Sequence, residues 1–332
     1  MAFDRQTYEK AENAVKQRRF SAENILNTRA EEIYSKIPEI KEIATTISQT
    51  SIELSKLIIR KEGNFSESFN KIKNQNLQGQ AMIKKLLMQN GYPENYLEPV
   101  YTCPSCKDKG YLNNGERCSC FNKLLTHFAV EKLNSEANMP ECDFEHFSLD
   151  YYKGVNDPSC PDCYRKMSDN LTFCKHYAGN FSLKSDSLFI LGQTGIGKTH
   201  ISLSIAKEVS SQGFTVAYGS LMNYLRIIEK EHFGRTSNSE TDTLQILLNT
   251  DLLILDDLGS EFKTNFSEAT LYNIINSRIN LGLPTIISSN LSVDELQKNY
   301  NERIISRLFS VFNTLMFFGQ DIRQIKRLRN EF

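Results

Sequence analysis

Residues 188–199 decide the fold, because an apolar run is followed there at once by a glycine-rich turn: Leu188-Phe189-Ile190-Leu191-Gly192-Gln193-Thr194-Gly195-Ile196-Gly197-Lys198-Thr199. Residues 192–199 fit the pattern G-x-x-x-x-G-K-[ST] of a phosphate-binding loop. A run compatible with a helix, residues 201–209, follows the turn. Glycines let backbone N–H groups turn toward phosphate oxygens, and the start of the following helix adds the positive end of its dipole. The sequence therefore predicts that residues 192–199 bind a nucleotide such as ATP.

Side chains on two segments are expected to complete this site. Lys198 should reach the β- and γ-phosphates, and Thr199 should ligate Mg²⁺. Residues 251–257, Asp-Leu-Leu-Ile-Leu-Asp-Asp, are an apolar run that ends in two carboxylates. A parallel strand delivers such groups to the carboxyl edge of the sheet, beside the phosphate loop. We therefore expect Asp256 to be the second magnesium ligand and Asp257 to orient the attacking water.

Other short apolar runs alternate with helical stretches in the second half of the chain, at residues 215–218, 252–255 and 285–287. Runs of this length are typical of strands buried on both faces, and their alternation with helices predicts an α/β fold with a parallel sheet. Asn290 ends the last run and could position the attacking water. Because Ser292 and Glu295 form a capping box just after it, a purely structural role for this turn stays open.

The first half of the chain has a different character. With 332 residues the chain is long enough for about two domains, and its net charge of −1 excludes a globally basic nucleic-acid coat. Residues 1–95 are poor in Gly and Pro, which predicts helices with a break near Pro38. This region is either a solvated scaffold or a partner-docking domain. No apolar run approaches the ~20 residues of a membrane span, and no signal peptide is recognisable, so we expect a cytoplasmic protein.

Four cysteines gather between these halves, as Cys103-x₂-Cys106 and Cys118-x-Cys120. Four thiolates at this spacing can bind Zn²⁺ tetrahedrally in a closed structural site. Because the second pair is C-x-C, His127 could replace one ligand. Redox chemistry and unbound thiols are the alternatives. The remaining cysteines are interpreted as core or surface thiols: Cys142, Cys160, Cys163 and Cys174.

The predicted division of the chain is a helical region at 1–95, a zinc-binding module at 96–135, a linker at 136–165 and a nucleotide-binding domain at 166–332. The last part resembles an AAA+ ATPase of the bacterial replicative helicase loader family, the DnaC/DnaI type. The IstB-type transposition helpers share this core. The resemblance covers roughly residues 140–329 and depends on the two motifs above, the strand at 285–290, and the segments 302–308 (Glu-Arg-Ile-Ile-Ser-Arg-Leu) and 319–323 (Gly-Gln-Asp-Ile-Arg).

The resemblance implies roles for two arginines. Arg307 matches the arginine finger that a neighbouring subunit supplies, with Arg303 as its competitor one helical turn earlier. Arg323 matches the second sensor, which contacts the nucleotide of its own subunit, although the basic tail around it could also meet nucleic-acid phosphate. A guanidinium suits both roles because it is planar, permanently charged and rich in donors.

The resemblance also implies partners: a hexameric replicative helicase docked on the first 135 residues, single-stranded DNA, and further copies of the chain. In this family the region of residues 221–230 is implicated in single-stranded DNA contact, and Tyr224, Arg226 and Lys230 are available there. An ordinary sheet-covering helix is the alternative for this segment. The expected function is ATP-dependent loading of the helicase in initiation or restart of replication. The alternatives are a transposition helper that acts with a transposase on duplex DNA, and a prophage-encoded loader or a module that holds ATP and scarcely hydrolyses it.

Overall fold

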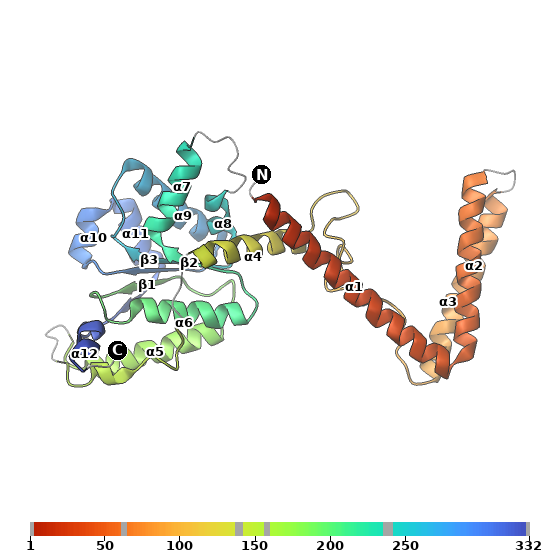
Figure 1. The fold of residues 1–332 in the computed structure, drawn as a ribbon, viewed down its shortest axis with the longest axis horizontal. Helices are drawn as coiled ribbons and strands as arrows, with labels where there is room; N and C mark the ends of the chain where they lie inside the picture. The colour runs from red at the N-terminus through yellow and green to blue at the C-terminus, as the bar shows by residue number, and fades with distance from the viewer. Residues whose placement is uncertain (1–2, 61–64, 137–141, 156–159, 235–241, 330–332) are drawn as a thin grey trace. The chain divides into compact units, whose positions relative to one another are not determined.

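The computed structural model describes residues 3–60, 65–136, 142–155, 160–234 and 242–329 (Figure 1). The chain divides into two compact units, residues 1–11 with 122–332, and residues 12–121. Parts of the linker predicted at 136–165, namely 137–141 and 156–159, lie outside the described residues. The domain division predicted from sequence stays a prediction.

A five-stranded, all-parallel sheet is the centre of the first unit. Its strand order is β2-β3-β4-β1-β5. The strands are β1 (Leu188–Leu191), β2 (Val216–Ser220), β3 (Leu252–Leu258), β4 (Thr285–Ser289) and β5 (Asn313–Met316). The phosphate loop follows β1, the two aspartates lie near the end of β3, and these two strands flank β4. Because the strands are parallel, the carboxyl ends of β1, β3 and β4 lie at one edge of the sheet, and the strand order makes them neighbours there. This is the arrangement that the sequence predicts.

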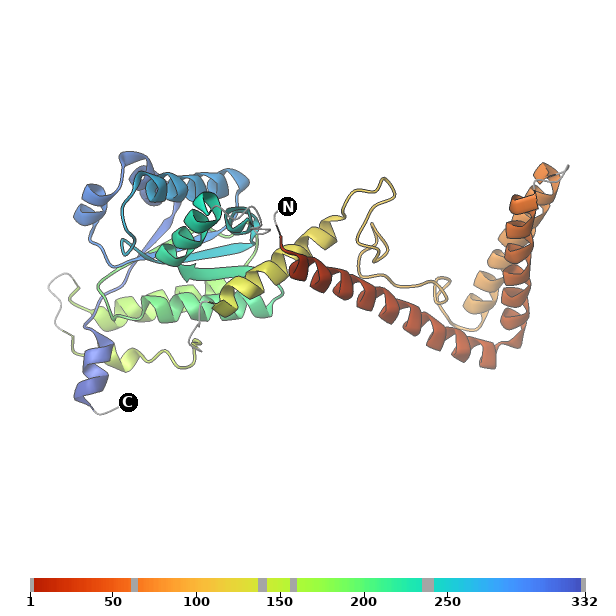
Figure 2. The same cartoon turned by 45° about the horizontal axis from the view of Figure 1, so that its top comes forward.

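Helices cover both faces of this sheet (Figures 1 and 2). One layer holds α5 (Cys163–Gly179) and α6 (Lys198–Ser211), beside the short helix η1 (Leu149–Tyr152). The other face is covered by α7 (Leu221–Phe233), α8 (Thr243–Asn249), α9 (Asn265–Leu281), α10 (Val293–Asn299) and α11 (Glu302–Val311). The helix α12 (Ile322–Leu328) ends the described chain.

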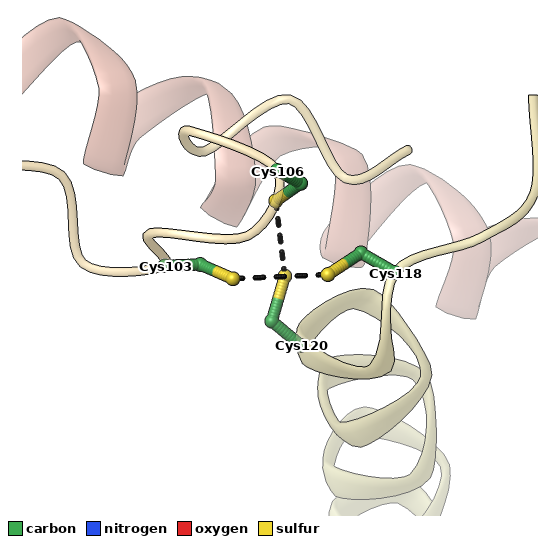
Figure 3. A group of neighbouring side chains, drawn as sticks. All are labelled: Cys103, Cys106, Cys118 and Cys120. Atoms are coloured by element: carbon green, nitrogen blue, oxygen red, sulfur yellow. Dashed lines mark hydrogen bonds between the residues drawn. The ribbon is translucent and has the colours of Figure 1, made fainter. Parts of the chain in front are cut away.

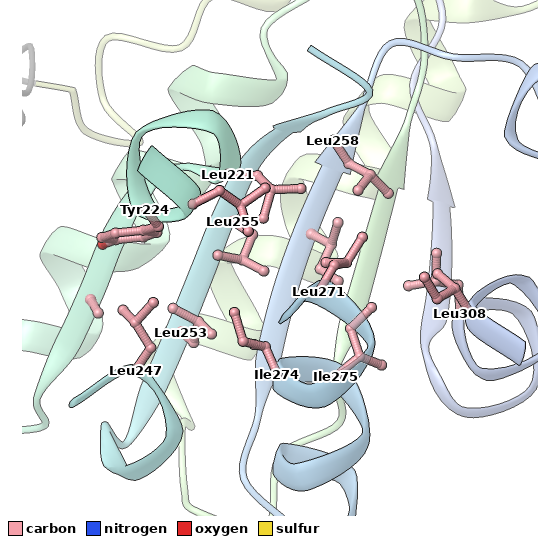
Figure 4. Close-up of a cluster of buried hydrophobic side chains, with 14 of the residues drawn as sticks. Leu221, Tyr224, Leu247, Leu253, Leu255, Leu258, Leu271, Ile274, Ile275 and Leu308 are labelled. Atoms are coloured by element: carbon pink, nitrogen blue, oxygen red, sulfur yellow. The ribbon is translucent and has the colours of Figure 1, made fainter. Parts of the chain in front are cut away.

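Alternation along the strands explains the two layers. On β3, Leu253 and Leu255 belong to the apolar cluster under α7 and α9, whereas Leu252 and Ile254 belong to the cluster under α5 and α6. All four side chains are fully buried. Figure 4 shows the first cluster, which joins Leu253 and Leu255 of β3 with Leu271 and Ile274 of α9. Burial on both faces is why these strands appear as unbroken apolar runs in the sequence, and the predicted fold class is confirmed.

The second unit is built from helices. It contains most of α1 (Arg5–Lys36), all of α2 (Pro38–Arg60) and α3 (Phe65–Gln89), and the loop that leads to α4 (Ser119–Glu136). Pro38 is the first residue of α2, so the predicted break between helices is confirmed. Helices α2 and α3 pack together, and Gly79 permits their close approach, since a Cβ there would lie 3.0 Å from Ile47. In the described residues, no helix combines the length and the apolar character needed to cross a membrane.

A fully buried arginine joins several loops at the edge of the sheet opposite the phosphate loop. Arg278, on α9, donates from its guanidinium to the hydroxyl of Thr285 at 2.8 Å and to the carbonyls of Leu247 at 2.8 Å, Thr250 at 2.9 Å and Pro284 at 2.6 Å. Burial lowers the pKa of this guanidinium to about 9. One side chain therefore satisfies carbonyls at the end of α8 and at the entries to β3 and β4.

The variant Arg278→Met is expected to lower the free energy of unfolding by about 3–5 kcal/mol, because it leaves several buried carbonyls without a donor. Urea denaturation followed by circular dichroism measures this loss. Arg327→Ala, at an exposed arginine of α12, is the control and should change stability little. A loss below about 1 kcal/mol for Arg278→Met would contradict this account.

Candidate nucleotide site and metal centre

The phosphate loop has the backbone geometry that its glycines predict. Gly195 and Gly197 have φ of 79° and 89°, in the left-handed region, and Gly197 is the N-cap of α6. The ammonium of Lys198 donates to the carbonyls of Gly192 and Gln193 at 2.8 Å each. Burial lowers the pKa of Lys198, and the nearby carboxylates of Asp257 and Asp256 act in the opposite direction. The positive charge of Lys198 and the N-terminus of α6 lie together, and both favour the binding of a phosphate group.

The hydroxyl of Thr199 and the carboxylate of Asp256 meet at the end of β3. Thr199 Oγ1 donates to Asp256 Oδ2 at 2.9 Å, which joins the phosphate loop to the acidic strand. Hydroxyl and carboxylate oxygens are the ligands that Mg²⁺ takes in nucleotide sites. The donor set therefore fits the predicted magnesium ion, with Thr199 and Asp256 as the residues that would hold it.

Asp257 is the accessible member of the acidic pair. It lies where the pairing of β3 with β4 is irregular, between Leu255 and Leu258, and its φ is +61°. Such bulges re-aim a side chain next to an active site. Burial, and then the charge of Asp256, raise the pKa of the Asp257 carboxyl. The bulge therefore directs Asp256 into the protein and Asp257 into the cavity beside the phosphate loop.

A cavity of about 320 Å³ lies over the phosphate loop. The predicted residues that line it are Thr194, Gly195, Gly197, Lys198, Thr199, Asp257, Asn290 and Arg323. Its other walls were not predicted from the sequence. They are Cys142, His146, Phe147, Ser148 and Tyr151 from the segment before the predicted domain, His200 from α6, and Ile322 and Lys326 from α12. The rings of Phe147 and Tyr151, together with Ile322, supply an apolar face on which a nucleobase can pack.

Specific contacts fix both wall segments on the phosphate loop. Tyr152 donates its hydroxyl to the carbonyl of Ile196 at 3.0 Å. From the other side, the backbone N–H of Ile322 donates to the carbonyl of Gly195 at 3.0 Å. A Cβ on Gly195 would lie 2.1 Å from Asp321 Oδ1, so only glycine allows α12 to start this close. Sequence reasoning missed the first wall because its signal, an aromatic-rich stretch at 144–152, has no recognisable spacing.

The structure separates the two predicted arginines. Arg323 lines the cavity of its own chain, and its charge acts on both Lys198 and Asp257. Arg307, on α11, is not among the lining residues. Its guanidinium donates to Asn276 Oδ1 at 2.9 Å and lies 4.8 Å from the centre of the Tyr272 ring. Arg303 is exposed one turn earlier. The placement of Arg307 outside its own cavity is what a finger directed at another subunit requires.

One residue suggested for single-stranded DNA contact is buried. Tyr224 is 3% exposed and packs in the apolar cluster shown in Figure 4. It therefore cannot stack on a base in this conformation, and its interpretation as a DNA contact is corrected to that of a core residue. The period of α7 explains the error, because Tyr224 shares the inward face with Leu221 and Leu225. Arg226 and Lys230 of the same helix are exposed.

The four clustered cysteines point toward one another (Figure 3). Their sulfur atoms all lie within 4.8 Å of one another, with 3.7 Å between Cys103 and Cys118 and 3.4 Å between Cys106 and Cys120. Sulfurs at the corners of a tetrahedron with Zn–S bonds of about 2.3 Å are about 3.8 Å apart. The cluster could therefore hold a tetrahedral metal ion. In the described part of the chain the group contains no histidine, so His127 is not a member of it.

A tight turn holds the first cysteine pair. The Asp108 carboxylate is buried and accepts the N–H groups of Thr102 at 2.8 Å and Cys103 at 2.9 Å. The N–H of Cys118 donates to the carbonyl of Gly110 at 2.9 Å, which closes the hairpin. Outside the cluster, Cys160, Cys163 and Cys174 are buried and Cys142 is partly buried, in keeping with the interpretation as core or surface thiols.

The nucleotide-binding half of the chain has recognisable relatives. Residues 169–309 match the family of IstB-like ATP binding proteins. The chain is similar to the replicative helicase loader DnaC of Escherichia coli strain K12, at 23% identity over 167 residues, which are 50% of this chain and 62% of that protein. It is similar to the replicative helicase loader DnaI of Bacillus subtilis strain 168, at 27% identity over 147 residues, 44% of this chain and 45% of that protein.

A crystal structure of DnaI is similar to 55% of this chain, and the match covers 95% of that structure at 19% identity, with a TM-score of 0.44. The chain spans less than two thirds of the length of the E. coli and B. subtilis loaders. The resemblance to helicase loaders expected from the motifs is confirmed.

Proposed function

We propose that this protein is an ATP-dependent loader that places the replicative DNA helicase onto single-stranded DNA. The observation that carries the nucleotide part is the 2.9 Å contact of Thr199 with Asp256, beneath a cavity lined by Lys198 and Arg323. The loading part is supported by the named activity of the DnaC and DnaI relatives. The unit that holds the four clustered cysteines, residues 12–121, is the proposed helicase-docking part. We propose zinc as the metal ion of this cluster.

The residues of the site divide the work of phosphoryl transfer. When bound between Thr199 and Asp256, magnesium would neutralise charge on the β- and γ-phosphates. Lys198 and Arg323 bring positive charge to the same cavity, and Asp257 and Asn290 orient water at its accessible side. Hydrolysis needs charge stabilisation on the far side of the γ-phosphate, and Arg307 of a second copy supplies it. The chain therefore associates through its ATP-binding domain.

The variant Lys198→Ala tests the nucleotide part of the proposal. We expect at least about a 100-fold loss of ATP hydrolysis, because the positive donor that would stabilise charge on the β- and γ-phosphates is removed. Steady-state phosphate release measures it, and equilibrium binding of a fluorescent ATP analogue gives the affinity. Lys175→Ala, at an exposed lysine of α5, is the control. Unchanged hydrolysis by Lys198→Ala would remove the phosphate-loop assignment.

The loading part needs a separate experiment. The full chain with ATP should retain a purified hexameric replicative helicase and increase the amount of that helicase on single-stranded DNA. A transposition helper would instead retain a transposase on duplex DNA and leave helicase loading unchanged. That second outcome would overturn the loader proposal and keep the nucleotide site intact. Arg226 and Lys230 of α7 are the proposed contacts with the DNA backbone.

A further inference from the structure

One buried hydroxyl contacts both aspartates of the nucleotide site. Ser288, on β4, is 0% exposed. Its Oγ donates to Asp256 Oδ1 and accepts the backbone N–H of Asp257 at 3.0 Å. The side chain of the first aspartate and the backbone of the second are thus tied to the same atom. This serine lies two residues before Asn290, on the strand between the phosphate loop and the acidic strand.

A second hydroxyl reaches the same carboxylate from the opposite neighbour of β3. Tyr218, on β2, donates its hydroxyl to Asp256 Oδ2 at 2.8 Å, and Thr199 donates to that oxygen at 2.9 Å. The Tyr218 side chain is buried in the layer beneath α6. Asp256 therefore receives hydroxyls from β2, β4 and α6, so both of its oxygens are held before any ion arrives.

The local backbone explains why such support is needed. Asp256 and Asp257 stand where the β3–β4 pairing is irregular, and Asp257 adopts a φ of +61° that L-residues rarely take. The regular ladder does not fix these side chains, and a backbone conformation of this kind persists only when its surroundings hold it. The bond from Asp257 N–H to Ser288 provides this support, because it ties the backbone at the irregular position to a fully buried side chain of β4.

We propose that Ser288 and Tyr218 are positioning residues, which hold the two aspartates in the geometry that receives magnesium and the attacking water. The inference rests on the proposed nucleotide function. Neither residue touches the nucleotide cavity, and both act through the carboxylates. Partners of this kind, one shell beyond the ion, typically change metal affinity or activity by about 10- to 100-fold when they are removed.

The chain offers a matched control for each residue. Ser289 is the next residue on β4 and equally buried, but its hydroxyl donates to the carbonyl of Leu258 and accepts the N–H of Leu291. Tyr177 is buried in the same layer as Tyr218, and its hydroxyl donates to the carbonyl of Asp186. Ser289→Ala and Tyr177→Phe thus remove comparable hydroxyls that contact backbone only.

The experiment measures binding of a non-hydrolysable ATP analogue by the full chain, with and without Mg²⁺, for Ser288→Ala, Tyr218→Phe and the two controls. We expect the affinity without the ion to stay within about twofold of the unaltered protein. The gain in affinity that Mg²⁺ produces should fall by about 10- to 100-fold in Ser288→Ala and Tyr218→Phe, and remain in the controls. Tyr218→Phe removes only the hydroxyl and keeps the buried ring, so we expect it to fold. It therefore tests the proposal even if Ser288→Ala folds poorly.

Three other results would be informative in different ways. If Ser288→Ala and Tyr218→Phe keep the Mg²⁺-dependent gain of their controls while the unaltered protein shows that gain, the positioning role is wrong and the nucleotide site stands. If the unaltered protein does not bind the analogue at all, the nucleotide site itself is wrong. If it binds the analogue with no response to Mg²⁺, the magnesium site at Thr199 and Asp256 is wrong, and the positioning role is overturned with it.

Discussion

Arg307→Ala is expected to bind ATP as the unaltered protein does and to hydrolyse it about 10³- to 10⁵-fold more slowly in the assembled form, the range that an arginine finger supplies. The reason is geometric. Arg307 lies outside the cavity of its own chain, held by Asn276 and the ring of Tyr272, and the proposal therefore has it act on the nucleotide of another copy. Phosphate release, measured over a range of protein concentrations, gives the effect.

A mixing experiment tests the action between copies directly. Arg307→Ala retains an intact phosphate loop, and Lys198→Ala retains an intact finger. Each variant alone should hydrolyse ATP poorly, whereas a mixture should recover activity, because the finger of one can enter the cavity of the other. Arg303→Ala, one turn away on the same helix and exposed, is the matched control. If Arg303→Ala loses activity and Arg307→Ala keeps it, the finger is Arg303.

Loss of the metal ion should have the largest effect on folding. We expect one zinc ion per chain by elemental analysis, and none in the double variant Cys103→Ser with Cys106→Ser. Structural zinc binding is worth about 10–16 kcal/mol in small zinc modules, and that free energy is folding free energy. The hairpin closed by Cys118 N–H and the Gly110 carbonyl should therefore open, which amide hydrogen exchange of residues 101–121 would detect.

The same double variant should still bind ATP, because the phosphate loop belongs to the other compact unit. Cys142→Ser is the control for the metal measurement and should keep the ion, since Cys142 lies outside the cluster. Full protection of residues 101–121 after complete removal of zinc would contradict a structural role for the ion.

Local signals made much of the fold and site predictable. The phosphate loop, the acidic strand and the four cysteines are each contiguous or closely spaced in sequence, and their chemistry needs those residues at those spacings. The strand β5 was not predicted because its two end residues are exposed, its two middle residues are only partly buried, and it lacks an unbroken apolar run. The burial of Tyr224 was not predicted from the sequence, because a tyrosine can serve either as an exposed stacking platform or as a core residue.

The sequence by itself determined the phosphate loop, the acidic end of one strand and the cysteine cluster, because each consists of residues that lie close together in the chain. Only the tertiary structure decided which distant groups meet there. Residues 142–152 and α12 form the cavity walls, and Tyr218 and Ser288 reach Asp256 from two different strands. The physical reason is that strand order places β2, β3 and β4 side by side, and no local pattern in the chain encodes which side chains then face each other.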